Sequence, residues 1–286
     1  MLGPDDRHFV IDMDVSAFLL SATRSLVQAP LTDAVRSPGG GASIGMLVTM
    51  VDLGASDPAM VACRPDWTAT QDVALHGAGP LTEGPIVVDA QLLRVGSKVI
   101  VVAARAYDGH GIEDFDALRK AIDDGQPAST CGPTLAASGL LTFARIPGSA
   151  APGMEEYDPA SWIGEVRPRL ERTPATGSMY ERLGARTLDG ATGRFELERT
   201  PYVANSIGTI NGGVLAVLVE VAAEAVSPGR VATDVQIHFL SQLKVGPAQT
   251  RADVLRHAGD HTVVSVEVVD AGNDDRLLAL ATVTLQ

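Results

Sequence analysis

Two acidic residues each interrupt a run of apolar residues that has the composition of a buried helix. Asp52 lies in ASIGMLVTMVDLGAS, residues 42–56, and Glu220 lies in TINGGVLAVLVEVAAE, residues 209–224. A carboxylate inside an apolar helix costs free energy unless a neighbouring group pairs with it or a reaction uses it. Because poor solvation makes a carboxylate a better base, both residues are candidates for acid–base or nucleophilic chemistry.

Glycines stand at the start of both runs. When Ser43 is aligned with Asn211, Gly45 falls on Gly213 and the two acidic residues coincide. The first turn of a helix has unpaired N–H groups and a partial positive charge, and a glycine there lets a ligand approach the backbone closely. Each run therefore predicts a helix with hydrogen-bond donors at its start and an acid in its middle.

The similarity continues downstream of both runs. DVALHGAGPLTEGP, residues 72–85, aligns with DVQIHFLSQLKVGP, residues 234–247, at a constant offset of 162 that holds as far as Asp108 and Asp270. The helical runs themselves align at an offset of 168. A register matched over this length predicts that the chain is a duplication.

Each half is predicted to have the same order of elements. A strand region comes first, residues 9–15 or 186–199; a glycine-opened helix and a run of antiparallel strands follow. The first half has an insertion at about residues 109–132, in which EDFDALRKAIDD is expected to form a surface helix. We expect an N-terminal unit (1–147), a linker (148–178) and a C-terminal unit (179–286). Each unit is of the α+β class, with the sheet curled round a buried helix.

The composition is that of a soluble globular protein. Of 286 residues, 45% are hydrophobic and 20% are charged. The net charge of −13 disfavours a nucleic-acid partner, the apolar runs are too short to suggest a membrane partner, and the start of the chain lacks the pattern of a secretory signal. Cys63 and Cys131 have no metal-binding spacing. We expect a cytoplasmic enzyme that acts on a small molecule without a metal or a cofactor.

The second half resembles a known family. NSIGTINGG, followed by Glu220 and the strand sequence VATDVQIHFL, is similar to the hotdog-fold thioesterases of the 4-hydroxybenzoyl-CoA and phenylacetate-pathway branch. That branch has an Asn, a Gly, then His-Gly-Gly at a helix start, and an acid nine residues after the His. The matching residues are Asn205, Gly208, Gly212, Gly213 and Glu220, and Asn211 replaces the His. The first half matches more weakly, because Ser37, Ser43 and Ile44 replace the Asn, the His and the first Gly of the pair.

The resemblance implies a double hotdog, in which two long helices are each wrapped by a curved antiparallel sheet and the sheets join into one. The halves would pack as the two subunits of the usual dimer do, giving a pseudo-dimer within one chain that can itself form a homodimer. In this family one subunit supplies the Asn and the helix-opening Gly, and the other supplies the acid and a strand hydroxyl.

Carried over to this chain, the resemblance implies one working site and one degenerate site. Gly212 would polarise the thioester carbonyl, Asp52 would act as general base or nucleophile, and Asn205 and Thr70 would position water or substrate. Substrate-binding residues are expected to be Asn211, Gly213, Met46 and Met50. The reciprocal set of Ser43 and Ile44 with Glu220 has lost the Asn, the Gly and the hydroxyl, which Ala232 replaces.

The implied function is hydrolysis of an acyl-CoA thioester to the free acid and CoA. An enoyl-CoA hydratase of the same fold is an alternative, although the sequence lacks the Gly-Asp-x-Asn-Pro-x-His stretch of those enzymes. A non-catalytic acyl-CoA-binding protein is another, since Asn211 replaces the motif His. Candidates for contact with the CoA phosphates are Arg64, Arg94, Lys98 and Arg256.

Overall fold

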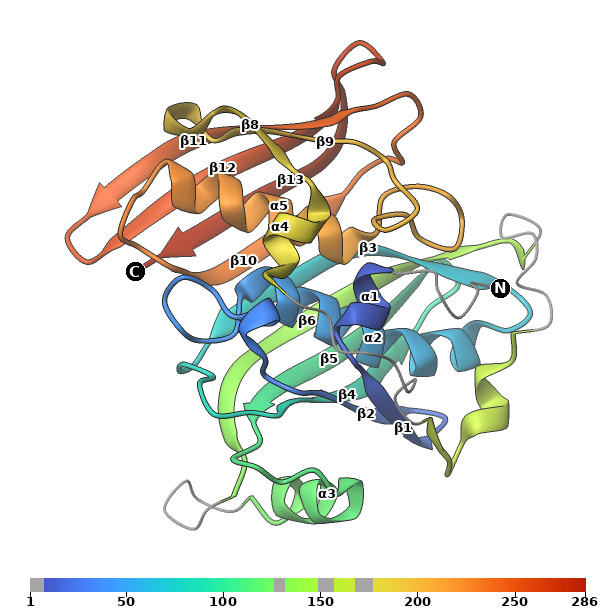
Figure 1. Ribbon diagram of the computed structural model, residues 1–286. Helices are drawn as coiled ribbons and strands as arrows, with labels where there is room; N and C mark the ends of the chain where they lie inside the picture. Colours follow the sequence, from blue (N-terminus) through green and yellow to red (C-terminus); the bar gives the residue numbers. More distant parts are fainter. Residues whose placement is uncertain (1–7, 126–131, 149–156, 168–176) are drawn as a thin grey trace. The chain divides into compact units, whose positions relative to one another are not determined.

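The computed structural model describes residues 8–125, 132–148, 157–167 and 177–286 (Figure 1). The chain forms two compact units, which we name after the acid that each contains. The Glu220 unit comprises Met1–Met13, Thr32–Thr49 and Arg172–Gln286. The Asp52 unit comprises Asp14–Leu31 and Met50–Glu171. Cys131 and most of the expected linker lie outside the described residues.

The Asp52 unit is built on an antiparallel sheet with the strand order β7-β1-β2-β4-β5-β6-β3. Its strands are β1 (Ser16–Ser21), β2 (Arg24–Ala29), β3 (Trp67–Gly77), β4 (Ile86–Val95), β5 (Val99–Asp108), β6 (Thr134–Ile146) and β7 (Val166–Arg167). A short 3-10 helix, Pro159–Trp162, precedes β7.

Helix α2 (Ile44–Cys63) begins in the Glu220 unit and continues into the Asp52 unit. In the Asp52 unit it lies against β2 and β4, because a Cβ atom at Gly54 would be 3.2 Å from Val27 and 3.3 Å from Val88. By length and composition alone α2 could cross a membrane, but 72% of its apolar window is buried inside the protein. It is therefore a core helix.

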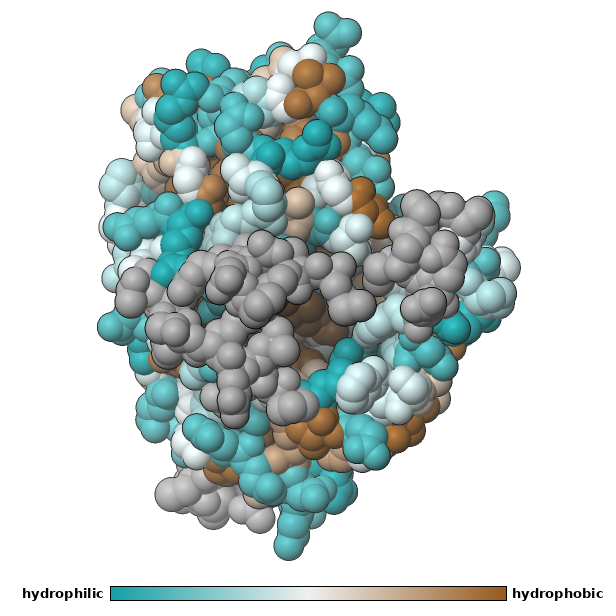
Figure 2. Space-filling view, turned by 45° about the vertical axis from the view of Figure 1, so that its right-hand side comes forward, coloured by the Kyte–Doolittle hydropathy of each residue, from teal (hydrophilic) through white to brown (hydrophobic). Residues whose placement is uncertain are grey.

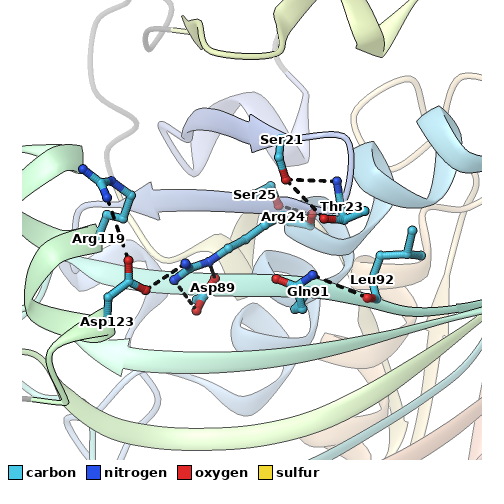
Figure 3. Close-up of polar contacts among 10 residues, drawn as sticks. Ser21, Thr23, Arg24, Ser25, Asp89, Gln91, Leu92, Arg119 and Asp123 are labelled. Carbon is cyan, nitrogen blue, oxygen red and sulfur yellow. Dashed lines mark hydrogen bonds and ion pairs between the residues drawn. The ribbon is translucent and has the colours of Figure 1, made fainter.

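Helix α3 (Phe115–Asp123) confirms the surface helix expected in the insertion. Its Leu118 is fully buried against Val87 and Tyr107 of the sheet. Figure 3 shows a second attachment, in which Arg24 of β2 contacts Asp89 of β4 at 2.8 Å and Asp123 of α3 at 2.8 Å. An apolar contact and a charge network thus hold the insertion on the sheet.

The Glu220 unit has an antiparallel sheet with the strand order β10-β13-β12-β11-β9-β8, and helix α5 (Gly212–Ala225) contacts five of these strands (Figure 1). Its strands are β8 (Arg186–Asp189), β9 (Arg194–Leu197), β10 (Ala232–Phe239), β11 (Ala248–Ala258), β12 (His261–Asp270) and β13 (Arg276–Leu285). The shorter helices are α1 (Phe9–Asp12), α4 (Met179–Leu183) and the 3-10 turns Asp33–Val35 and Gly190–Thr192. On the face seen in Figure 2, hydrophilic residues predominate.

Two glycines let α5 and the first turns of α2 pack closely within the Glu220 unit. A Cβ atom at Gly45 would lie 2.6 Å from the Cα atom of Val217, and one at Gly213 would lie 2.2 Å from Oγ1 of Thr49. The two contacts are equivalent in the repeat, because Gly45 and Gly213 are 168 positions apart, and so are Thr49 and Val217. The approach of the two helices is therefore two-fold symmetric.

The same backbone hydrogen bonds occur before both helices, at the offset of 168. The N–H of Ser43 donates to Val35 and that of Asn211 donates to Val203, both over 2.8–3.1 Å. Further downstream, at the offset of 162, the carboxylates of Asp108 and Asp270 each accept three N–H groups from the turn that precedes a cis Gly–Pro bond.

The start of the chain differs from the prediction. Residues 9–15, expected as a strand, instead contain the short helix α1, which His8 caps by accepting the N–H of Val10 over 3.2 Å. Phe9 and Met13 are both fully buried at a spacing of four residues, which suits one face of a helix. The first strand is β1, further along the chain. The expected region 186–199 does contain strands, β8 and β9.

The compact units also do not coincide with the expected sequence boundaries, because residues 8–13 and 32–49 pack with the second half. Those boundaries describe the repeat in the sequence, and they stay a prediction.

Candidate active site

The carboxylate of Glu220 occupies the N-terminus of α2. Its Oε1 accepts the N–H of Ile44 over 3.0 Å, and its Oε2 accepts the N–H of Gly45 over 3.1 Å and the hydroxyl of Ser43. The side chain of Glu220 is 1% exposed and that of Ser43 is fully buried. The donors that could serve an oxyanion at α2 are therefore already bound to a carboxylate of the protein itself.

A fourth donor comes from α4. The hydroxyl of Tyr180 donates to Oε2 of Glu220 over 3.1 Å. Burial raises the pKa of Glu220, and the four donors act in the opposite direction by stabilising the charged form. Burial and the negative charge of Glu220 also raise the pKa of Tyr180. Sequence reasoning missed Tyr180, which lies outside the aligned repeat and next to the linker.

The N-terminus of α5 is different. Asn211 caps the helix, since its Oδ1 accepts the N–H of Gly213 over 2.8 Å. The contacts of the described residues include no acceptor for the N–H of Gly212. Gly212 faces the ring of Phe239, whose Cζ would lie 3.3 Å from a Cβ atom at that position. The Gly212 N–H is thus a donor in this turn that remains available for a substrate oxygen.

The two other predicted residues at this end organise the loop and the helix packing. Oδ1 of Asn205 accepts the N–H groups of Ile207 and Thr209, both over 3.1 Å, so it fixes the loop that leads into α5. Gly213 is buried against Thr49 and its N–H is bonded to Asn211. The N–H of Gly213 and Oδ1 of Asn205 are therefore both occupied and are not free for a ligand.

Asp52 and Thr70 come together in the Asp52 unit. The hydroxyl of Thr70 on β3 donates to Oδ1 of Asp52 on α2 over 2.6 Å. Burial raises the pKa of Asp52 to about 6, and the Thr70 hydrogen bond offsets part of that rise. Among the described residues no cationic side chain pairs with the Asp52 carboxylate. A carboxylate with this pKa is mostly ionised at pH 7 and still accepts a proton readily, which suits a general base.

The remaining predicted residues take varied positions. Met46 and Met50 are fully buried in α2. The four cations proposed for CoA are all exposed, namely Arg64, Arg94, Lys98 and Arg256, and Arg64 donates to the carbonyl of Tyr157 over 2.5 Å. Within the described ranges no group of three or more His, Cys, Asp or Glu residues could hold a metal ion.

Comparisons with known proteins point to thioesterases and esterases. Residues 200–286 match the family model of the acyl-CoA thioesterase N-terminal domain. A protein of Saccharolobus solfataricus whose name suggests an esterase is 26% identical over 99 residues, which cover 35% of this chain and 71% of that protein.

Three solved structures resemble the whole chain. A Lactobacillus plantarum protein whose name suggests an oleoyl thioesterase has a TM-score of 0.60 at 13% identity, covering 94% of this chain and 98% of that one. The TesB protein of Mycobacterium avium subspecies paratuberculosis has a TM-score of 0.56 at 11% identity and covers 97% of each chain. A protein of Alicyclobacillus acidocaldarius described as having the hot dog fold has a TM-score of 0.54 at 11% identity and covers 98% of each.

At these identities the solved structures establish the hotdog fold. Over residues 200–286 the chain is similar to the acyl-CoA thioesterase N-terminal domain, and these matches support, in general terms, the hydrolysis of a thioester.

Proposed function

We propose that the chain is a double hotdog that hydrolyses an acyl-CoA thioester, with Asp52 as the general base or nucleophile. The observation that carries this proposal is the Asp52 carboxylate itself, which lies in an apolar helix, has a pKa raised to about 6 and is bonded to a neutral hydroxyl. Buried acids without a cationic partner cost stability and are concentrated at sites where they perform chemistry. The repeated backbone hydrogen bonds support the duplication.

In the general-base route, Asp52 takes a proton from a water molecule while the water oxygen bonds to the thioester carbon. The N–H of Gly212 stabilises the oxyanion that forms. The C–S bond then breaks, the acid is released, and the proton that Asp52 took from water passes to the CoA thiolate, which returns Asp52 to its ionised form. The hydroxyl of Thr70 holds the Asp52 carboxylate in position throughout. The assignment of Gly212 and Asp52 to one reaction rests on the repeat. In the repeat Gly212 corresponds to Ile44 and Asp52 corresponds to Glu220, and Glu220 accepts the N–H of Ile44.

The test is release of free thiol from a panel of acyl-CoAs of different chain length, followed with a thiol-reactive dye. We expect turnover of at least one acyl-CoA, and Asp52→Asn should lower kcat by ~10²-fold or more, the range for loss of a general base. Absence of thiol release across the panel, together with acyl-CoA binding, would favour a non-catalytic binding protein. Loss of activity on chelation and its return with zinc would also contradict the proposal.

A further inference from the structure

The turn between β4 and β5 forms a small basic cavity in the Asp52 unit. Its volume is about 410 Å³, and it is lined by Arg94, Gly96, Ser97, Lys98, Val99 and Val101. The lining residues include two cations, one hydroxyl and no acid. In a chain with a net charge of −13, such a local excess of positive charge favours an anionic ligand.

Both cations are available. Arg94 and Lys98 are exposed, and neither side chain makes a hydrogen bond or an ion pair with the residues that the structure describes. Two acids of neighbouring segments are already paired: Asp89 with Arg24 at 2.8 Å, and Asp66 with Arg145 at 3.0 Å. A ligand at the turn would therefore meet positive charge that the protein has not neutralised.

The turn is held in place by its neighbours. The N–H of Gly96 donates to the carbonyl of Val99 over 2.8 Å, and the N–H of Arg145 on β6 donates to the carbonyl of Lys98 over 2.9 Å. The guanidinium of Arg145 also contacts the carbonyl of Gly96 at 3.5 Å. These bonds position the two cations on a fixed turn, which lowers the entropic cost of binding.

The equivalent turn of the second half has a different charge. Both hairpins share a β-bulge at the same place, after Leu92 and after Val254, so Arg94 and Arg256 occupy equivalent positions. At the position of Lys98, however, the second half has Asp260, which pairs with His261 at 3.3 Å. The basic turn is thus a property of the half that contains Asp52 and Thr70, and Arg256 is therefore withdrawn as a candidate for contact with the CoA phosphates.

The turn lies within reach of Asp52 through the sheet. Val95 pairs with Ile100, Ile100 with Phe143, and Phe143 with Thr70. Three steps between neighbouring strands amount to roughly 14 Å. The pantetheine arm of CoA has about as many backbone bonds as four extended residues, which also span roughly 14 Å. Arg94 pairs with Val101, and the side chains of this pair lie on the face of the sheet opposite to that of the buried Ile100. Because Arg94 is next to the turn where the sheet ends, the pantetheine arm would pass round that end to reach the other face.

We propose that the turn between β4 and β5 binds the phosphate groups of CoA through Arg94 and Lys98. This inference rests on the proposed hydrolysis of an acyl-CoA and adds the residues that select a phosphorylated thiol. An acyl carrier protein is a less suitable source of the same thioester, because its acidic surface would meet a strongly acidic enzyme.

The experiment compares Arg94→Glu and Lys98→Asp with the matched control Arg256→Glu. Lys98→Asp introduces the residue that the second half has at the same position, and Arg256→Glu makes the same charge change at the equivalent bulge. Each variant is assayed with an acyl-CoA and with the same acyl group on N-acetylcysteamine, which has no phosphate. Binding of adenosine 3′,5′-bisphosphate, the nucleotide end of CoA, is measured separately by calorimetry.

We expect the KM for the acyl-CoA to rise about tenfold in both turn variants, equivalent to about 1.4 kcal/mol. The KM for the N-acetylcysteamine thioester should not change in these variants, and the KM for the acyl-CoA should not change in Arg256→Glu. An unchanged KM, or an equal rise for both substrates, would overturn the assignment. So would preferential hydrolysis of an acyl carrier protein with a KM insensitive to the two turn variants. If the wild type hydrolyses no thioester, the proposed function fails. The calorimetry then still tests the turn, which should bind adenosine 3′,5′-bisphosphate in the wild type and should bind it no longer in Lys98→Asp.

Discussion

The chemistry of the candidate site depends on how one hydroxyl affects one carboxylate. Thr70 donates to Asp52 over 2.6 Å and lowers a pKa that burial raises to about 6. Hydrogen bonds to charged groups contribute about 1.5–3 kcal/mol. The pKa of Asp52, and with it the pH range of activity, is therefore set by a balance between burial and a single hydrogen bond.

Replacing Thr70 with Val should shift that balance. Without the hydroxyl the pKa of Asp52 rises, so the fall in kcat/KM on the acidic side should move upwards by roughly one pH unit, which corresponds to 1.36 kcal/mol. A pH profile of kcat/KM between pH 4.5 and 8 measures the shift, and Thr70→Ser should restore the original profile. An acidic limb that is the same in Thr70→Val and the wild type would show that Asp52 is not the titrating base.

Helix α5 contains a second acid whose pKa predicts how stability depends on pH. Burial and the negative charge of Glu220 raise the pKa of Glu224 to about 7 from an ordinary value of 4.5. Between these two values the folded state binds more protons than the unfolded state, so the free energy of unfolding falls as the pH rises. Glu224→Gln removes that proton uptake and retains an oxygen that can accept the N–H of Ala232.

We therefore expect Glu224→Gln to unfold at a higher urea concentration than the wild type at pH 8, and at nearly the same concentration at pH 4. The measurement is the urea midpoint as a function of pH. A wild-type midpoint that does not decline between pH 5 and 7 would contradict the pKa assignment.

The close packing of α2 and α5 predicts an asymmetric response to added methyl groups. Gly45→Ala places a Cβ atom against the backbone of Val217, whereas Gly213→Ala places one against the side chain of Thr49. Overpacking of this kind costs about 1–3 kcal/mol. Thr49→Ala should recover much of the loss in Gly213→Ala. No substitution at Val217 should recover Gly45→Ala, because a backbone cannot be shortened. Urea unfolding of the double mutants tests this, and equal rescue of both glycine variants would argue against the packing.

The elements that sequence could predict are those with a local signal. The two helices could be predicted because glycines open long apolar runs, and the strands after them could be predicted from their repeated register. Strand β1 was missed because its buried positions are three residues apart, so the alternation typical of a strand is absent. The contact of Tyr180 with Glu220 could not be predicted, since it joins residues 40 positions apart with no counterpart in the repeat.

At the scale of the whole molecule, the two helix starts that align in the sequence repeat differ in what their N–H groups bind. The first turn of α2 is filled by Glu220, which accepts the N–H groups of Ile44 and Gly45. The first turn of α5 keeps the N–H of Gly212 without an acceptor among the described residues. Since an oxyanion and a carboxylate compete for the same donors, the start of α2 cannot bind a substrate while Glu220 is in place.

The chain should therefore bind one substrate, not two. Calorimetric titration with a non-hydrolysable acyl-CoA thioether should give a stoichiometry of one per chain. Asp52→Asn should lower turnover by ~10²-fold or more, whereas Glu220→Gln should change it little, because Glu220 ties the start of α2 to α5 and takes no part in the reaction. Glu220→Gln is expected to lower the urea midpoint, because the amide NH2 that replaces one oxygen would face at least the donor N–H of Ile44, and would face three donors if it replaced Oε2. A stoichiometry of two, or a larger loss of turnover in Glu220→Gln than in Asp52→Asn, would show that the start of α2 is the working site.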